Sequence, residues 1–403
     1  MNTAVTTVTT RRYDIDWLRI IAVLLLFPFH VARIFNLDEQ FYAKSAVLSK
    51  GLTYVITYLE PWHMPLFFFL AGASTWFALS HRGGGSYAWE RFKRLLVPFL
   101  VGLVVLIPPQ SYLGLLGHGG EPGSFFNWLP TFFQLHEADM DGYFMGGMTF
   151  GHLWFIIHLF FYSLILLPLV LFLRRGAGRR LVDLLARAAT KPIVILTFGL
   201  LATPAMFVPD LAGGNPIRLA VPFILGYLLV SDARFELAVD RHRLAALILG
   251  PVACVAVAYF SANGGPGLAG WAAGVYDFYA GLLVPWFCIV AFLGYGRRFL
   301  NRGGAVQRYA AEASYPVYLL HQTIIVAVGF TVLKAGLGVP LSYTVILAGS
   351  FAGTLLCYEV VRRVNVLRVV FGLKWRRRSP AASQSADAVT PAAQEAGAPT
   401  ALR

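Results

Sequence analysis

Charged residues are scarce in this sequence of 403 residues. Asp, Glu, Lys and Arg make up 13% of it, whereas hydrophobic residues make up 57%. Soluble globular domains carry about 25% charged residues, so this composition excludes that class. The composition is that of a polytopic membrane protein, and we expect an all-α fold.

Cysteine is also scarce, and no cofactor motif accompanies it. Cys254, Cys288 and Cys357 all lie in apolar stretches without the spacing of metal ligands, so zinc sites and disulfides are poorly supported. The sequence has no Walker loop, dinucleotide fingerprint, nucleophile elbow or paired-cysteine site, which weakens phosphoryl-transfer and redox functions. We therefore expect no metal and no permanently bound cofactor.

Apolar runs of about twenty residues, the length that crosses a bilayer, are abundant instead. They predict about ten transmembrane helices, at residues 15–36, 54–79, 95–116, 152–173, 192–209, 216–231, 244–262, 276–296, 315–333 and 341–361.

Basic residues fall almost entirely on one side of these predicted helices. The formal net charge of +13 could suggest nucleic acid, but short basic loops between apolar runs are the pattern that orients membrane helices. If the N-terminus is cytoplasmic, every Lys and Arg lies on the inner side except Arg19, Arg33, Lys44, Lys50, Arg218 and Lys334. The asymmetry predicts that both termini are cytoplasmic, with the lipid bilayer and no nucleic acid as a partner.

The chain divides into four predicted parts. Residues 1–14 are a cytoplasmic N-terminal segment, and residues 15–361 form the membrane domain. Residues 362–378 are basic and amphipathic, which suits the surface of an anionic inner leaflet. Residues 379–403 are rich in small residues and cannot bury a core, so we expect them to be disordered.

The first predicted helix carries three polar side chains in an apolar segment, Asp16, Arg19 and His30. Such residues are unfavourable in a membrane and often functional. Eleven helical steps separate Arg19 from His30, which places them on one face about 16 Å apart in depth. A long, thin ligand with a phosphate end and a reactive end, such as the pantetheine arm of coenzyme A, fits this spacing. Alternatively, Arg19 extends to the headgroups and pairs with Asp16, while His30 is a structural core residue.

The second predicted helix places Glu60 and His63 about 10 to 15 Å below the outer surface, near the depth of His30. A carboxylate that orients a histidine is a common catalytic arrangement, although Glu60 can also pair locally beside Pro61.

Arg91 and Arg94 lie one helical turn apart at the inner end of the third predicted helix. Two guanidinium groups at a membrane entrance can bind phosphates through bidentate hydrogen bonds. Flanking arginines that only orient the helix explain the same pattern.

Two further histidines lie in later spans. His152 begins the fourth predicted helix at the outer face, where it could contact an external acceptor, and His158 lies on nearly the opposite side of that helix. His321 lies roughly 10 Å above the inner surface in the ninth predicted helix, where we expect a structural role.

These residues resemble the membrane acyltransferase family 3, whose signature is an arginine, ten residues and a histidine in the first transmembrane helix. Arg19 and His30 have this spacing, and the resemblance continues through Arg91-x-x-Arg94, LFFFLAGAS, HLWFI and YPVYLLH. The segments RYDIDWLR and EPWHMPLFFFLAG are most similar to the glucan biosynthesis protein C branch, which is associated with succinyl modification of periplasmic glucans.

The resemblance implies an O-acyltransferase in the bacterial cytoplasmic (inner) membrane. It would move an acetyl or succinyl group from cytoplasmic acyl-CoA to a hydroxyl of a periplasmic or cell-surface carbohydrate, alone or with glycan-synthesis partners. By the resemblance His30 is the essential histidine, Arg19 its donor-binding partner, and Arg91 and Arg94 the arginine pair near the donor. To these the residue patterns add Glu60 as a second catalytic residue and a supporting set, Asp16, His63, His152 and His321.

Two other functions stay open from the sequence. A transporter would export an acyl compound or glycan along the same polar path without chemistry. A scaffold for a glycan-synthesis complex would need neither Arg19 nor His30, and their alignment on one helix face disfavours it.

Overall fold

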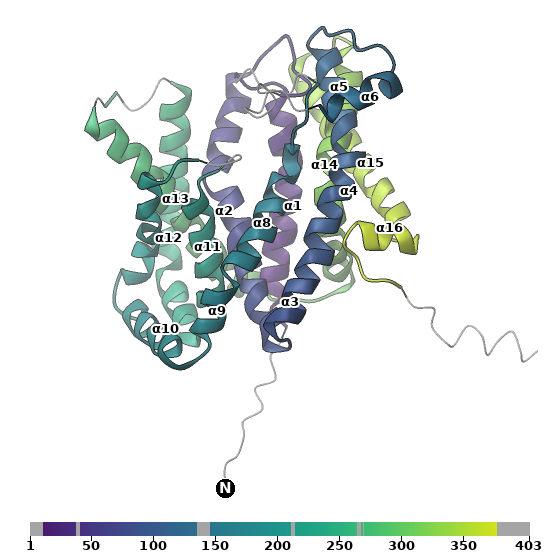
Figure 1. Cartoon of the computed structure of the whole chain (residues 1–403). Coiled ribbons are helices and arrows are strands. Elements are labelled where there is room, and N and C mark those ends of the chain that lie inside the picture. The colour runs from purple at the N-terminus through teal and green to yellow at the C-terminus, as the bar shows by residue number, and fades with distance from the viewer. Residues whose placement is uncertain are drawn as a thin grey trace, which may run out of the picture.

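A computed structural model describes residues 11–37, 41–134, 146–210, 214–263, 267–268 and 270–376 of the chain. All regular elements within these ranges are helices (Figure 1), which confirms the predicted all-α fold. The first part of the chain forms α1 (Tyr13–Arg33), α2 (Lys50–Ser80), α3 (Gly84–Arg91), the π-helix η1 (Phe92–Leu96), α4 (Val97–Val105), α5 (Ile107–Gly117) and α6 (Phe125–Phe132). The middle part forms the 3₁₀ turn η2 (Gly151–Leu153), α8 (Trp154–Ile165), α9 (Leu167–Leu173), α10 (Gly176–Ala189), the 3₁₀ helix η3 (Val194–Phe207) and α11 (Pro216–Leu229). The last part forms α12 (Ala233–Ala262), α13 (Trp271–Phe299), α14 (Ala305–Leu333), α15 (Val339–Val361) and α16 (Asn365–Val370).

Six helical segments of the described chain are long and apolar enough to cross a membrane, and the bent pair α8–α9 makes a seventh if it counts as one span. The three remaining predicted spans correspond to elements outside this set, namely α2, η3 and α11. α2 has 31 residues but is not among these six segments. The helices η3 and α11 have 14 residues each, short of the roughly 20 that cross a bilayer. The protein is therefore multi-pass, and the total of ten spans stays a prediction.

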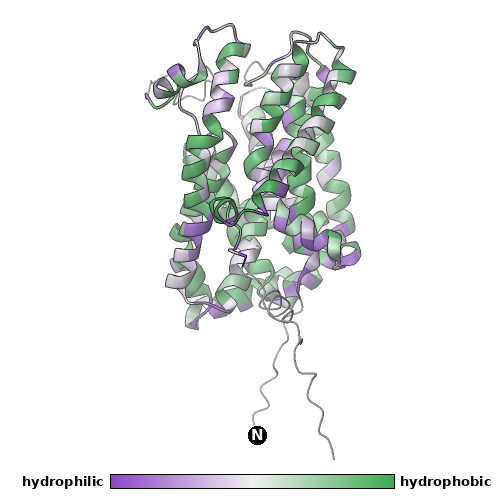
Figure 2. Cartoon of the chain, turned by 90° about the vertical axis from the view of Figure 1, so that its right-hand side faces the viewer, coloured by the Kyte–Doolittle hydropathy of each residue, from purple (hydrophilic) through white to green (hydrophobic). Residues whose placement is uncertain are grey.

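The helices run side by side, with hydrophobic residues along their length and hydrophilic residues concentrated towards the two ends (Figure 2). The basic helices α3 and α10 lie at the same end of the molecule as the beginning of α1 (Figure 1). This arrangement has the one-sided charge distribution that orients membrane helices. The cytoplasmic location of the termini stays a prediction, and the tail at 379–403 lies outside the described residues.

Helix α1 is the central helix of the part of the bundle that holds the polar residues. It packs against α2, α13, α14 and α15. Asp14 and Asp16 lie in its first turn, where negative side chains interact favourably with the helix dipole. The buried Asp14 binds Arg12 at 2.8 Å, and Arg12 also pairs with Glu236 of α12. The start of α1 is thereby tied to the neighbouring bundle.

Two glycines bring α2 and α11 into close contact. A Cβ atom added at Gly72 would lie 1.8 Å from the backbone oxygen of Phe223, and one added at Gly226 would lie 1.9 Å from that of Phe69. Small residues are the usual means by which membrane helices approach this closely. The contact fixes α2 on its α11 side and leaves Ser74 and Phe67 to face the site described below.

The predicted membrane-surface segment at 362–378 is described as far as residue 376. After α15 the chain forms the short helix α16 and then turns back, so that Arg368, Gly372, Leu373 and Lys374 line a cavity. Contact of this segment with a membrane surface stays a prediction.

Candidate functional site

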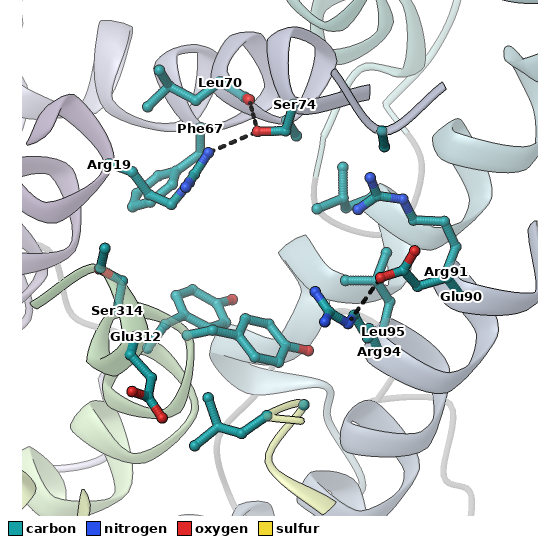
Figure 3. A pocket seen from close by; sticks show the side chains of 18 of the residues that line it. Arg19, Phe67, Leu70, Ser74, Glu90, Arg91, Arg94, Leu95, Glu312 and Ser314 are labelled. Atoms are coloured by element: carbon teal, nitrogen blue, oxygen red, sulfur yellow. Dashed lines mark hydrogen bonds and ion pairs between the residues drawn. The ribbon is translucent and has the colours of Figure 1, made fainter. Parts of the chain in front are cut away.

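A cavity of about 660 Å³ lies between α1, α2, the α3–η1 region, α8, α14 and the C-terminal segment (Figure 3). Its charged side chains are predominantly basic: Arg19, Arg82, Arg91, Arg94, Arg368 and Lys374 face only Glu90 and Glu312. We call this cavity the basic pocket. Its excess positive charge suits an anionic ligand, and phosphate in particular, because guanidinium groups bind phosphate oxygens in pairs.

Arg19 extends from α1 into the basic pocket, opposite Arg91 and Arg94 (Figure 3). Its guanidinium donates to Ser74 Oγ at 2.7 Å and to Asp16 Oδ1 at 3.3 Å. Asp16 also accepts from Arg11 and Gln307, so its charge is shared among several donors. The predicted contact between Arg19 and Asp16 is therefore present, and the same side chain lines the basic pocket. Its role in binding the donor stays a prediction.

Arg91 and Arg94 reach the pocket from a stretch where the helix widens. Arg91 lies over the ring of Tyr87 at 4.6 Å, and Arg94 contacts Glu90 at 3.2 Å. The widening at Phe92–Leu96 is a π-helix in which Val97 N–H donates to Phe92 O. Pro98 has no N–H for the usual bond to the Arg94 carbonyl, so the chain adopts the wider turn that often marks functional sites.

Three aromatic rings form the deep wall of the basic pocket. The ring centroid of Phe155 lies 5.5 Å from that of Phe67 and 5.6 Å from that of Tyr318. The centroids of Phe67 and Tyr318 lie 6.5 Å apart. The Tyr318 hydroxyl donates to the backbone oxygen of His152, and this hydrogen bond holds the Tyr318 ring beside His152. We call these three residues the aromatic partition, since all three line the pocket and two of them, Phe67 and Tyr318, also contact histidine rings.

Four histidines gather behind the partition. The rings of His30 and His321 lie 5.1 Å apart, as do those of His152 and His321. His63 is connected to the other three histidines through Phe29, whose ring centroid lies 5.2 Å from that of His30 and 6.1 Å from that of His63. The histidine cluster therefore combines residues from α1, α2, η2 and α14, four parts of the chain that are distant in sequence.

Hydrogen bonds to backbone carbonyls fix three of these rings. His63 Nε2 donates to Ala22 O at 2.7 Å, His152 Nε2 to Leu319 O at 2.9 Å, and His321 Nδ1 to Tyr318 O at 2.6 Å. A nitrogen that donates to a carbonyl carries the proton, so in the neutral ring the other nitrogen is an acceptor.

Buried nitrogens without a protein partner in the described chain remain on three of the histidines: His30 Nδ1, His152 Nδ1 and His321 Nε2. Buried polar atoms are normally satisfied. In His152 and His321 these nitrogens are the lone-pair side of the neutral ring, so the cluster contains atoms able to accept a proton from a bound hydroxyl.

The structure corrects the expected positions of two of these histidines. The sequence placed His152 at the outer face and His321 near the inner surface, whereas the structure brings their rings within 5.1 Å of each other. His152 lies in the 3₁₀ turn Gly151–Leu153, where it is 5% exposed and contacts Leu319 O of α14. His321 was expected near the inner surface, but α14 begins at Ala305 rather than near residue 315, so His321 lies roughly 24 Å along the helix.

Glu60 does not share the environment of the histidines. Its side chain is exposed on α2, whereas His63, one turn further along, is buried. His158 binds the carbonyl of Trp154 on its own helix, in keeping with its expected separation from His152. No group of three His, Cys, Asp or Glu side chains among the described residues is arranged to hold a metal ion.

The site also includes residues for which the sequence analysis predicted no role. Ser74, Phe155, Tyr315 and Tyr318 line the pocket. Tyr318 and His321 are three positions apart and so share a helix face, which was a usable signal. No comparable pattern indicates Ser74 or Phe155.

The arginine–histidine spacing on α1, the basic pocket and the histidine cluster can be compared with known proteins. No curated protein and no solved structure matches the chain. Among protein families, residues 12–359 match the acyltransferase domain of acyltransferase family 3. This match includes every residue of the histidine cluster and most of the basic pocket. The chain therefore belongs to acyltransferase family 3, a family of membrane acyltransferases.

Proposed function

We propose that this protein is an O-acyltransferase of the bacterial cytoplasmic membrane, with cytoplasmic acyl-CoA as donor. The acyl group is acetyl or succinyl, and the acceptor is a hydroxyl of a periplasmic or cell-surface carbohydrate. The observation that carries the proposal is that α1 contributes Arg19 to a basic pocket and His30 to a histidine cluster, with the aromatic partition between them. The succinyl-transferring glucan branch is the subgroup that we favour.

The basic pocket suits the phosphate-bearing end of coenzyme A. Arg91 and Arg94 lie on one side and Arg19 on the other, so phosphate oxygens between them can accept several charge-assisted hydrogen bonds. From Arg19 the face of α1 leads over about 16 Å to His30, a distance that suits the pantetheine arm. The thioester then lies at the aromatic partition.

In the proposed reaction His30 acts as general base. A histidine nitrogen takes the proton of the acceptor hydroxyl, whose oxygen attacks the thioester carbonyl carbon. The carbon–sulfur bond breaks, the acyl group becomes an ester of the acceptor, and the thiolate takes up the proton and leaves as coenzyme A. His321, with its ring 5.1 Å from that of His30 and an unpartnered Nε2, is positioned to support or relay this proton. His63 and His152 keep supporting roles in the proposal, and Glu60 moves from a catalytic to a supporting role because its side chain is exposed on α2.

The competing function is export of an acyl compound or glycan without chemistry. Phe67, Phe155 and Tyr318 speak against it, because their rings pack against one another where the pocket meets the cluster, so a whole cargo could pass only if they separated. An acyltransferase needs only the thioester to come within reach of the histidine cluster at this point, whereas a transporter must pass its whole cargo through it.

Reconstitution in proteoliposomes separates the two functions. Acetyl-CoA or succinyl-CoA is supplied on one side and an oligosaccharide on the other, while free thiol and acceptor mass are followed together. The proposal predicts that coenzyme A is released in step with a mass gain of one acyl group per modified hydroxyl. Flux of donor or acceptor across the bilayer without thiol release would establish the transporter instead. Mass spectrometry of glycans from cells with and without the gene then identifies acyl group and acceptor.

A further inference from the structure

The C-terminal end of the described chain folds back onto the basic pocket. We call residues 365–376 the fold-back segment. It begins with α16, which contacts α4, and then reverses so that Gly372, Leu373 and Lys374 face the cavity. Asn365 closes the reversal, because its side chain donates to Arg376 O at 3.2 Å and accepts from Arg376 N at 3.0 Å. These hydrogen bonds join the two ends of the segment, so it has a fixed conformation where it lines the pocket.

Arg368 anchors the segment. Its guanidinium donates to Glu312 of α14 at 3.0 Å, to Arg362 O at 3.0 Å and to Lys374 O at 2.9 Å. The side chain is 11% exposed. Through these three hydrogen bonds, Arg368 holds the segment to α14 and sets the position of Lys374.

Gly372 lets the segment approach the pocket closely. Its φ is +74°, in the left-handed region that favours glycine. A Cβ atom at this position would lie 2.4 Å from the ring of Tyr315 and 3.5 Å from Arg94 O. The backbone therefore rests directly on Tyr315, beside the arginine pair.

The contacts of Arg368 and Gly372 place the ammonium group of Lys374 at the edge of the basic pocket. It lines the pocket together with Arg91 and Arg94, and its side chain forms no ion pair with another residue of the described chain. Arg91 and Arg94, by contrast, already contact Tyr87 and Glu90. An unpaired ammonium at the rim of a basic cavity is a contact for an anionic group of the ligand.

We propose that the fold-back segment is part of the donor site: Lys374 contacts a phosphate of the donor, and Arg368 is the positioning residue that holds Lys374 there. The inference rests on the proposed function, since it takes acyl-CoA as the ligand of the basic pocket. It gives this end of the chain a role in donor affinity beyond any contact with the membrane surface.

The test measures binding of coenzyme A and of pantetheine, which lacks the phosphates, to the full chain in nanodiscs of zwitterionic lipid. Lys374→Gln is compared with Arg363→Gln, which removes a charge nearby at an exposed residue outside the pocket. We expect Lys374→Gln to weaken coenzyme A binding about fivefold, the upper range for a partly exposed ion pair, without affecting pantetheine. Arg363→Gln should match the wild type.

Arg368→Gln and Gly372→Ala form the second arm, because both displace the segment rather than the cation. Each should weaken coenzyme A binding at least as much as Lys374→Gln and raise KM for the donor, while kcat at saturating donor stays near the wild-type value. Equal coenzyme A affinities for Lys374→Gln and Arg363→Gln would overturn the inference. Failure of the wild-type protein to bind coenzyme A would instead overturn the proposed function. If the second pair does not fold, the Lys374 comparison still decides.

Discussion

The basic pocket and the histidine cluster are neighbours with opposite physical character. The pocket is lined by six basic side chains and is partly open, with Lys374 exposed. The cluster consists of histidine rings surrounded by aromatic side chains, and His63, His152 and His321 are at most 5% exposed. The difference indicates a division of labour, because charge in a solvated cavity suits recognition of phosphates, whereas a buried site excludes water from a reactive ester.

The aromatic partition maintains this difference. Phe67 contacts His63 at 5.3 Å between ring centroids, and Tyr318 contacts His152 at 5.8 Å, while both rings line the pocket on their other side. The two regions therefore share a wall one ring thick. Substitutions on either side of this wall should affect binding and chemistry separately.

The largest expected effect is loss of the histidine that we propose as general base. We expect His30→Ala to lower acyl transfer by about 10²- to 10⁴-fold, the usual contribution of a general base, while coenzyme A still binds. Thiol release and coenzyme A binding measure the two properties on the same preparation. His158→Ala is the matched control, since this histidine bonds to Trp154 O on its own helix. Normal transfer by His30→Ala protein would contradict the assignment.

The second-largest effect is expected from removing positive charge from the basic pocket. The double variant Arg91→Gln with Arg94→Gln should raise the Kd for coenzyme A by about tenfold to hundredfold, because each lost charge-assisted hydrogen bond contributes about 1.5 to 3 kcal/mol before solvent screening. Isothermal titration calorimetry measures the change. The control double variant Arg179→Gln with Arg180→Gln removes two exposed charges from α10 and should bind normally. Equal binding by both double variants would place the donor phosphates elsewhere.

A smaller effect is expected from opening the wall itself. Phe155→Ala removes one ring of the partition, and water entering from the pocket should raise acceptor-independent hydrolysis of acyl-CoA roughly threefold to tenfold. Phe161→Ala on the same helix removes an exposed ring, 51% accessible, and should leave hydrolysis unchanged. Thiol release without acceptor is the readout, with the melting temperature checked for both. An unchanged hydrolysis rate in folded Phe155→Ala protein would refute the barrier role.

The smallest effect concerns the placement of Arg19. Ser74→Ala removes the acceptor 2.7 Å from its guanidinium and should raise the donor KM by about threefold, with kcat unchanged. Ser80→Ala serves as control, because its hydroxyl bonds to Trp76 O outside the pocket. If kcat fell and KM stayed constant, Arg19 would belong to the chemistry and not to donor recognition.

The sequence predicted those parts of the site that lie on one helix, because a spacing pattern relates only residues that are close together in the chain. Arg19 and His30 share one helix face, so an eleven-residue spacing was enough to relate them. The predicted all-α class likewise follows from composition. The cluster depends on α1, α2, η2 and α14 packing together, and no local periodicity contains that information.

Local structure that sequence reasoning overlooked has identifiable causes. The π-helix before Pro98 aims Arg94 into the pocket, and proline alone does not specify whether a helix bends, widens or ends. The charge pattern at 362–378 is the same for a segment on a membrane and for one folded onto a basic cavity. Only the contacts of Arg368 and Gly372 distinguish the two.

The most direct test of the division of labour is the dependence of coenzyme A release on donor concentration, measured for the wild type, His30→Ala and the Arg91→Gln, Arg94→Gln double variant. The account predicts that the arginine variant approaches the wild-type rate at saturating donor, whereas His30→Ala stays slow at every concentration. An arginine variant that stays slow at saturation, or a His30→Ala protein that recovers there, would contradict it.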